Sequence, residues 1–434
     1  MSSRNFEQLE QDLHPPLTRH EALVESDRCY FCYDAPCVTA CPTGIDIPLF
    51  IRQIKTDNPK GSARTIFDEN ILGGMCARVC PTETLCEQVC VRNTAEDNPV
   101  RIGELQRYST DHLMATGKQP YSRASETGFR IAVVGAGPAG LSCAHRLAMY
   151  GHTVDILDAK PKPGGLNEYG IAAYKTVDDF ARKEVDYILS IGGITVKHDQ
   201  VLGETIKLDQ LKTEYNAVFL GLGLGAVNDL NVEGSDLDGV EDAVSFIAEL
   251  RQSDELASLE VGRRTVVIGG GMTAIDAAVQ TKMLGAEEVT LVYRRGIENM
   301  NASVFEQDLA KVNGVMIRTW LQPVRVLGNE GAVTGVEFAY MHTNAGVYEP
   351  TGENLTIACE KVLKAIGQQY SDSWEHDSIV LENGRIKVDA DRKTSDTRIW
   401  AGGDCIAGGE DLTVAAVQDG KLAAESIHSS LKGS

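Results

Sequence analysis

The stretch IAVVGAGPAGLSCAHRLAMYGHTVDILD, residues Ile131–Asp158, decides the fold of this chain. An apolar, β-branched run leads into Gly135, Gly137 and Gly140 in the spacing GxGxxG, and Asp158 ends a second apolar run eighteen residues later. The first glycine permits a tight turn, the second lets the backbone approach a pyrophosphate, and the third lets helix and strand pack closely. The stretch therefore predicts a dinucleotide-binding unit in which Asp158 accepts hydrogen bonds from a ribose.

A second unit of the same kind begins with TVVIGGGMTAIDAAV, residues 265–279. Its glycine turn has the form GxGxxA and starts 134 residues after the first one. Two such units predict two nucleotides. The strand that follows ends in Arg294 and Arg295 rather than in a carboxylate, which favours NADP(H) over NAD(H) because arginines there can hold a ribose 2′-phosphate; solvated surface charge is the alternative. The predicted contacts are Gly269, Gly271, Met272, Thr273, Ala274, Arg294 and Arg295.

Composition narrows the class of protein. The 434 residues allow two to four domains, and the net charge of −21 comes with no block of basic residues. This argues against binding to nucleic acid or to an anionic membrane surface. The polar N-terminus has no apolar core for a signal peptide, and no apolar run approaches spanning length. We therefore expect a cytoplasmic protein with no membrane partner.

Eight of the eleven cysteines form two runs, C-x2-C-x4-C-x3-C-P over Cys29–Cys41 and C-x3-C-P-x4-C-x3-C over Cys76–Cys90. Two runs of four thiolates match two [4Fe-4S] clusters, and the cysteine before a proline typically ligates the other cluster, so Cys41 is expected to cross over. Zinc sites prefer repeated C-x2-C knuckles, and disulfides are rare where thiols stay reduced. Between the runs, residues 45–54 and 62–71 carry apolar residues at helical spacing, which predicts a mostly helical domain.

The segments RCYFCYDAPCVTACPTGIDIPLFIRQI, GGMCARVCPTETLCEQVC and IGELQRY resemble the N-terminal domain of dihydropyrimidine dehydrogenase. From about residue 26 to the C-terminus, the chain resembles the separate NAD(P)H-accepting subunit of the bacterial two-subunit form. The resemblance implies one cluster on Cys29, Cys32, Cys37 and Cys90, and another on Cys41, Cys80, Cys86 and Gln106. Cys76 is then a non-ligand, although counting residues alone would give it to a cluster. Without the resemblance, Gln106 would pass for a surface residue of a helix.

The segments around the two nucleotide units fit a flavoprotein. Residues 111–128 are polar and predict a linker, and 217–225 predict a buried strand that ends in glycines. In PKPGGLNEYGIAAYK, the glycines can approach a flavin, and Lys175 is expected either near the isoalloxazine edge or as a solvated charge. The resembling family usually has proline where this chain has Ala172, which leaves the loop conformation open.

The C-terminal third completes the pattern. Residues 319–347 predict an antiparallel hairpin or three-stranded sheet, and 361–368 resemble the strand that returns to the flavin domain in pyridine-nucleotide-dependent flavoproteins. In that fold the Asp of a Gly-Gly-Asp segment contacts the flavin ribityl and pyrophosphate, and the next helix directs its dipole at the flavin. The predicted FAD contacts are Gly135, Gly137, Pro138, Ala139, Gly140, Asp158, Gly165, Leu166, Gly403, Asp404 and Thr413.

We therefore predict an α/β chain with a helical two-cluster iron-sulfur domain followed by two Rossmann-like domains of the pyridine-nucleotide-disulfide-oxidoreductase type, the second inserted in the first. The predicted bounds are 1–125 for the cluster domain, 126–235 and 365–434 for the FAD domain, and 236–364 for the NAD(P)H domain.

The resemblance implies an electron-input subunit that oxidises NAD(P)H with FAD. It passes electrons through two [4Fe-4S] clusters to a catalytic FMN and iron-sulfur subunit, which reduces uracil or thymine within a hetero-oligomer. The small subunit of glutamate synthase is the alternative, although its first cysteine run usually lacks the forms DAPC and CPTGIDIP present here. A disulfide reductase would need a CxxC among Cys143, Cys359 and Cys405, which are isolated. A non-catalytic redox sensor is a further alternative.

Overall fold

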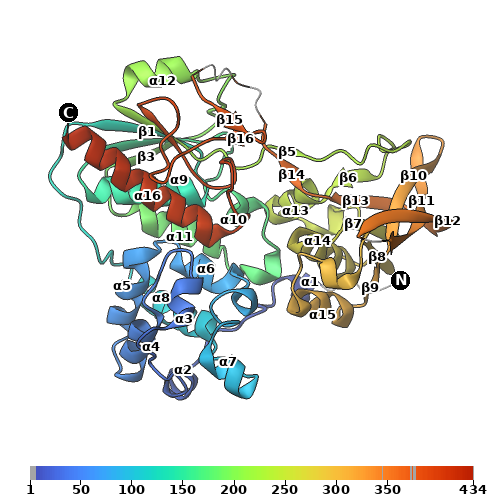
Figure 1. Cartoon of the computed structure of the whole chain (residues 1–434), viewed down its shortest axis with the longest axis horizontal. Helices are drawn as coiled ribbons and strands as arrows, with labels where there is room; N and C mark the ends of the chain where they lie inside the picture. The colour runs from blue at the N-terminus through green and yellow to red at the C-terminus, as the bar shows by residue number, and fades with distance from the viewer. Residues whose placement is uncertain (1–5, 345, 372–373, 375–377, 434) are drawn as a thin grey trace. The chain divides into compact units, whose positions relative to one another are not determined.

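The computed structural model describes residues 6–344, 346–371, 374 and 378–433 (Figure 1). The chain divides into two compact units. One contains residues 1–13, 169–177 and 226–369, and the other contains 14–168, 178–225 and 370–434. The ends of the predicted domains at residues 1–5 and 434 lie outside the described residues, and the predicted domain bounds remain a prediction.

The N-terminal part of the larger unit is helical, as the sequence predicts. Thr18 caps the first of these helices through a capping box with Glu21, and the side chains of Asp46 and Asn58 cap two of the others. Apolar residues at helical spacing, such as Phe50, face a common core. The helices are α2 (Arg19–Asp27), α3 (Pro36–Ala40), α4 (Ile47–Lys55), α5 (Pro59–Glu69), α6 (Gly73–Val79), α7 (Val91–Glu96) and α8 (Ile102–Met114).

Helix α8 corrects the predicted linker. The helix continues to Met114, so residues 111–114 of the predicted 111–128 linker are helical. Asp111 is held in the helix by Arg78, whose Nη2 lies 2.9 Å from a carboxylate oxygen, and by Arg107. Asp111 is therefore polar because it forms ion pairs within the helix, and residues 111–114 are not part of a linker.

The larger unit also holds a parallel five-stranded sheet in the order β17-β4-β1-β2-β3. Its strands are β1 (Arg130–Val134), β2 (Thr153–Leu157), β3 (Ile194–Lys197), β4 (Ala217–Leu220) and β17 (Ile399–Ala401). The order reverses between β1 and β4, which is where open α/β sheets bind their ligands. Helices of this part are α9 (Pro138–Met149), α11 (Phe180–Leu189), α12 (Leu208–Glu214) and α16 (Thr413–Lys432), with the short α10 (Leu166–Tyr169) after the second strand.

The smaller unit, which contains residues 226–369, has its own parallel sheet in the order β6-β13-β7-β8-β9. Its strands are β6 (Val240–Asp242), β7 (Arg264–Gly269), β8 (Glu288–Val292), β9 (Val315–Arg318) and β13 (Lys361–Ala365). Helices α13 (Ala243–Gln252), α14 (Met272–Met283) and α15 (Val304–Val312) belong to the same unit. Residues 361–368, predicted to return the chain to the flavin domain, instead begin with β13, which pairs with β6 and β7 in this sheet.

Smaller elements complete this unit. The strands β10 (Leu321–Asn329), β11 (Ala332–Asn344) and β12 (Val347–Ala358) form an antiparallel sheet, which confirms the three-stranded form of the prediction for 319–347 and extends it to residue 358. The pair β5 (Ala226–Val227) and β14 (Gln368–Gln369) is also antiparallel. The N-terminal helix α1 (Phe6–Leu9) packs against α14 and buries Leu9, and the backbone N of Leu13 donates to the Tyr174 carbonyl at 2.9 Å.

Along the described chain, no helix is both long enough and apolar enough to cross a membrane.

Candidate cofactor sites

The first glycine turn follows β1 and needs its glycines for steric reasons. Gly135 has φ +100°, and a Cβ there would lie 2.2 Å from the carbonyl oxygen of Gly221. A Cβ on Gly140 would lie 1.9 Å from the carbonyl oxygen of Gly135, so no larger residue fits between helix and turn. Gly137 is the N-cap of α9, and no side chain caps the first backbone N–H groups of this helix. The turn therefore has the form that accepts a pyrophosphate.

Asp158 lies beside this turn, one residue after β2. Its Oδ2 accepts a hydrogen bond from the backbone N of Ala136, and its Oδ1 accepts one from the backbone N of Lys160 at 2.7 Å. These bonds hold a largely buried carboxylate at the carboxyl edge of the sheet. The position fits a ribose acceptor, which is the role that the sequence predicts.

The other predicted FAD contacts gather at the same edge. The backbone N of Gly164 donates to the Ala136 carbonyl at 2.9 Å, and a Cβ on Gly165 would lie 2.7 Å from the Cα of Gly137. Leu166 begins α10, and Pro138 and Ala139 begin α9. The two glycine loops therefore touch backbone to backbone at this edge.

The Gly-Gly-Asp segment comes to this edge from the C-terminal part of the chain. Gly403 has φ +78°, and a Cβ there would lie 3.2 Å from the Cβ of Ala139. Burial, followed by repulsion from Asp411, raises the pKa of Asp404 to about 7. Thr413 is the first residue of α16 and donates to Oδ1 of Asn167 at 2.9 Å. The predicted FAD residues therefore all lie in the larger unit, near this edge of its sheet.

The second glycine turn follows β7. Gly269 has φ +156°, and a Cβ there would lie 2.2 Å from the carbonyl oxygen of Ala365. Gly271 caps α14, and a Cβ there would meet no atom within 4 Å. Met272, Thr273 and Ala274 form the first turn of α14, with Ala274 fully buried. The open space at Gly271 fits the approach of a nucleotide phosphate to the helix start.

Arg294 and Arg295 follow β8 by two and three residues. Arg294 is exposed, whereas Arg295 is half-buried with its guanidinium carbon 5.4 Å from the ring centroid of Tyr348. The ring therefore orients Arg295, and Arg294 is the freer cation of the two. The 2′-phosphate role of both arginines remains a prediction.

The first predicted cluster site is a cavity lined by Cys29, Cys32, Cys37 and Cys90. Its other walls are mostly apolar, including Ile51, and burial raises the pKa of the Cys37 thiol to about 12, with the charges of Cys29 and Cys90 adding to it. Four partly buried thiols that lie close together cannot all ionise without compensating positive charge, which iron would supply. The residues therefore fit an iron-sulfur cluster.

The second predicted site gathers Cys41, Cys80 and Cys86 with Cys76. A hydrogen bond with Cys76, then burial, and then the charges of the other three thiols raise the pKa of Cys80. Cys76 is buried in α6, one turn before Cys80. The predicted non-ligand therefore lies among the predicted ligands, and its exclusion stays a prediction. Among the described residues, no three His, Cys, Asp or Glu side chains converge on a position for a single metal ion.

Gln106 lies on α8 and is not a surface residue, with 8% of its area exposed. Its Nε2 donates to the carbonyl oxygen of Gly73 at 2.7 Å, at the start of α6. This bond fixes the orientation of the amide and leaves Oε1 as the atom that can ligate iron. The environment fits the ligand role that the resemblance implies.

Lys175 is buried in the smaller unit, which rules out the solvated charge that the sequence left open. Its Nζ lies 2.7 Å from Oδ1 of Asp276 and 2.7 Å from Oε1 of Glu306. The Tyr174 hydroxyl donates to the same Asp276 oxygen at 2.9 Å. Burial alone would lower the pKa of Lys175, but the two carboxylates outweigh burial and raise it. Its predicted place at the flavin edge remains a prediction.

Sequence reasoning missed Asp276 and Glu306. The available signal was Asp276 itself, which interrupts the apolar pattern TAIDAAV at a position that α14 buries. A carboxylate at such a position requires a partner. The partner, however, lies about a hundred residues away in the chain, and the pattern does not identify it.

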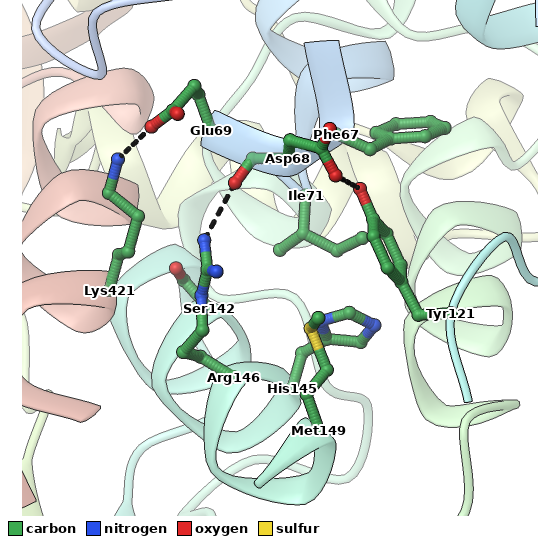
Figure 2. A pocket seen from close by; sticks show the side chains of 10 residues that line it. All are labelled: Phe67, Asp68, Glu69, Ile71, Tyr121, Ser142, His145, Arg146, Met149 and Lys421. Carbon is green, nitrogen blue, oxygen red and sulfur yellow. Dashed lines mark hydrogen bonds and ion pairs between the residues drawn. The ribbon is translucent and has the colours of Figure 1, made fainter. Parts of the chain in front are cut away.

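A further small cavity in the larger unit lies where α5 meets α9 and α16 (Figure 2). Lys421 donates to Glu69 at 2.6 Å, the Arg146 guanidinium donates to the Asp68 carbonyl at 2.7 Å, and the Tyr121 hydroxyl donates to the Asp68 side chain at 2.7 Å. None of the predicted cofactor residues lines this cavity. These contacts join the cluster-domain helix α5 to the helices around the first glycine turn.

Comparison with known proteins places these features in one family. Residues 129–420 match the family model for pyridine nucleotide-disulphide oxidoreductases, and residues 4–118 match the model for dihydropyrimidine dehydrogenase domain II with its 4Fe-4S cluster. Together the two matches imply FAD, NAD(P)H and [4Fe-4S] clusters as cofactors. The fold resembles FprA of Mycobacterium tuberculosis, with a TM-score of 0.59 and 19% identity over 70% of this chain and 85% of that one.

Full-length relatives agree with the family matches. The chain is 37% identical to the NAD-dependent dihydropyrimidine dehydrogenase subunit PreT of Escherichia coli K12, over 97% of both chains. It is 33% identical to the small chain of NADPH glutamate synthase from the same organism, over 96% of this chain and 93% of that one. The chain therefore belongs to the pyridine nucleotide-disulphide oxidoreductase family, in the group that contains these two relatives.

Proposed function

We propose that this chain is the cytoplasmic electron-input subunit of a two-subunit dihydropyrimidine dehydrogenase. It would oxidise NAD(P)H and deliver electrons to a catalytic FMN and iron-sulfur subunit that reduces uracil or thymine. One observation carries the proposal: a single compact unit combines a cavity lined by Cys29, Cys32, Cys37 and Cys90 with a glycine turn for a dinucleotide. The full-length similarity to a dihydropyrimidine dehydrogenase subunit supports the choice of substrate.

When bound, the cofactors supply hydride transfer from nicotinamide to flavin and one-electron transfer to the clusters. The protein supplies position. The start of α9 would hold the FAD pyrophosphate through backbone N–H groups, and Asp158 would accept from the ribose. The start of α16 would place the positive end of its dipole near the flavin and stabilise negative charge there. In the smaller unit, the start of α14 would hold the nicotinamide nucleotide at Gly271.

The coenzyme preference rests on Arg294. Its exposed side chain beyond β8 favours NADP(H), whereas the dihydropyrimidine dehydrogenase relative is named NAD-dependent and the glutamate synthase relative is named for NADPH. Both coenzymes therefore belong in the test.

A second candidate function is that of a glutamate synthase small chain, because the chain aligns with that protein over 96% of its length. It ranks below the first for two reasons. The identity is 33% against 37%, and the first cysteine run carries the forms DAPC and CPTGIDIP.

The test has two stages. Anaerobically purified protein, loaded with FAD and iron, should reduce ferricyanide with NADH or NADPH, which a non-catalytic redox sensor would not do. A C-terminally tagged chain recovered from its native host should then bring down a partner that makes NAD(P)H oxidation depend on uracil. Oxidation that depends instead on glutamine and 2-oxoglutarate would replace the first candidate by the second. Reduction of uracil by the isolated chain would refute the proposal that a separate catalytic subunit carries the substrate site.

A further inference from the structure

Glu184 is a buried acid that none of the cofactor sites uses. It lies on α11 with 1% of its area exposed. Its Oε1 accepts hydrogen bonds from the backbone N of Gly74 at 2.8 Å and of Met75 at 3.0 Å. Its Oε2 is buried and finds no hydrogen-bond partner among the described residues. A buried carboxylate with one unsatisfied oxygen is costly, whereas a neutral acid in the same place costs less.

The first turn of α6 is shaped around this carboxyl group. A Cβ on Gly74 would lie 2.7 Å from both Oε1 of Glu184 and Cζ of Phe180, so a side chain there would displace the acid. From the other side, Arg78 donates to the Gly74 carbonyl at 3.0 Å and places its guanidinium carbon 3.3 Å from the centroid of the Phe180 ring. The turn is therefore held at both its N–H and its C=O groups.

The helix that begins with this turn contacts two of the proposed ligands of the second cluster. Cys80 is the C-terminal cap of α6, and the Gly73 carbonyl accepts the hydrogen bond that orients the Gln106 amide. Helix α11, in turn, packs against α9, whose start forms the proposed FAD pyrophosphate site. Glu184 is thus a direct side-chain link between α11, which packs against α9, and α6, which ends at Cys80.

The surroundings of Glu184 decide its charge. Burial raises its pKa to about 8, against the opposing effect of the two backbone N–H groups and of Arg78 on α6. On α8, Asp111 raises the pKa further, and Arg107 pairs with Asp111. On α9, His145 contacts the Tyr121 ring and Arg146 bonds the Asp68 carbonyl, so neither pairs with Glu184. Burial and the unpartnered Oε2 therefore both favour the neutral form of this acid.

We propose that Glu184 is a proton-linked positioning residue of the electron path, which joins α11 to α6 in its neutral form and makes the second cluster sensitive to the protonation of one buried acid. The proposal rests on the proposed function, because it needs electrons to pass from FAD to this cluster. Deprotonation places a negative charge next to α6 and leaves a second buried oxygen to solvate. Both effects oppose adding an electron to the cluster and weaken the contact between the helices.

The test compares Glu184→Gln with wild-type holoprotein under anaerobic conditions. Glutamine is isosteric with the neutral acid, keeps the acceptor for Gly74 and Met75, and cannot ionise. The midpoint potential of the second cluster is measured by EPR-monitored titration between pH 6.5 and 9.5. We expect the wild-type potential to fall as pH rises through about 8, and E184Q to keep the low-pH wild-type value throughout. Asp186→Asn, an exposed change on the same helix, should leave the wild-type profile unchanged.

The pH dependence of the thermal stability of the protein provides a second test of the Glu184 proposal. The folded protein keeps the Glu184 proton to about pH 8, whereas an unfolded chain releases it near pH 4.5, so this group stabilises the fold at low pH and that stabilisation is lost as pH rises through this window. E184Q should therefore gain in thermal midpoint relative to wild type as pH rises, and Glu184→Ala should lose at every pH.

Two results would overturn the inference. One is a potential in E184Q that falls with pH as in wild type, and the other is loss of iron or of the fold in E184Q at pH 7, which would show that the charged carboxylate is required. Neither result touches the proposed function, which fails instead if wild-type holoprotein shows no cluster signal or no NAD(P)H oxidation.

Discussion

Replacing Lys175 by methionine removes one cation from between two buried carboxylates. Nζ lies 2.7 Å from both Asp276 and Glu306, and all three side chains are 5–8% exposed. Methionine fills a similar volume, so the loss is mainly electrostatic. Removing one partner of a buried ion pair typically costs about 3–5 kcal/mol. A second estimate agrees: if one carboxyl must then take a proton at pH 7 instead of near pH 4, three pKa units at about 1.4 kcal/mol each give about 4 kcal/mol.

Thermal unfolding monitored by calorimetry is the assay. For a unit of this size, about 4 kcal/mol corresponds to a fall of about 8–16 °C in Tm. The loss should shrink by about 1.4 kcal/mol per pH unit on going from pH 7 towards pH 4, because the orphaned carboxyls then take up a proton more easily. Lys311→Met is the matched control, since Lys311 pairs with Asp308 at the surface and should cost less than about 1 kcal/mol.

Adding Asp276→Asn and Glu306→Gln to the Lys175 variant should recover part of the loss, because no buried charge then remains. A loss below about 1 kcal/mol for K175M, or a loss that stays constant between pH 7 and pH 5, would refute the electrostatic reasoning.

The remaining predictions concern the cofactor sites. Gly271→Ala should fold normally, because its Cβ meets no protein atom within 4 Å, yet raise the KM for NAD(P)H about tenfold or more by crowding the phosphate; unchanged KM in a steady-state assay would contradict the site. Neutral replacements of Arg294 and Arg295 should raise the KM for NADPH more than that for NADH, and equal effects would count against a 2′-phosphate contact. Cys86→Ser should lower iron content by about one cluster, whereas Cys76→Ala should retain it; iron loss in the second variant would make Cys76 a ligand.

Local backbone demands are what the sequence predicted well. Gly135 and Gly269 are required because each has a positive φ and because a Cβ there would lie 2.2 Å from a carbonyl oxygen. Such local steric requirements can be recognised from the spacing of glycines in the sequence. The fold class and the helical character of the cluster domain follow from periodicity in the same way.

Contacts between distant segments were not predictable from pattern. Lys175 meets Glu306 across 131 residues, and Glu184 meets Gly74 across 110. Nothing in the local sequence of either acid specifies these partners, because pairing is decided by how helices pack. The linker error at residues 111–114 has the same origin, since Asp111 is helical through ion pairs with Arg78 and Arg107.

The cysteine runs were predictable only in part. Spacing was sufficient to expect clusters, and the cavity lined by Cys29, Cys32, Cys37 and Cys90 suits the set that the resemblance implied. Spacing could not separate Cys76 from the ligands, because Cys76 lies one helical turn before Cys80 and its thiol interacts with the Cys80 thiol.

The packing of the N-terminal helix α1 affects where an affinity tag or a truncation can be placed. Although residues 6–13 fall within the predicted cluster domain, 1–125, Leu9 is buried against α14, and the backbone N of Leu13 donates to the Tyr174 carbonyl. Affinity handles are therefore better fused at the other terminus. A shortened clone that starts at residue 14 should keep its brown colour but bind coenzyme poorly, a defect easily mistaken for a damaged flavoprotein.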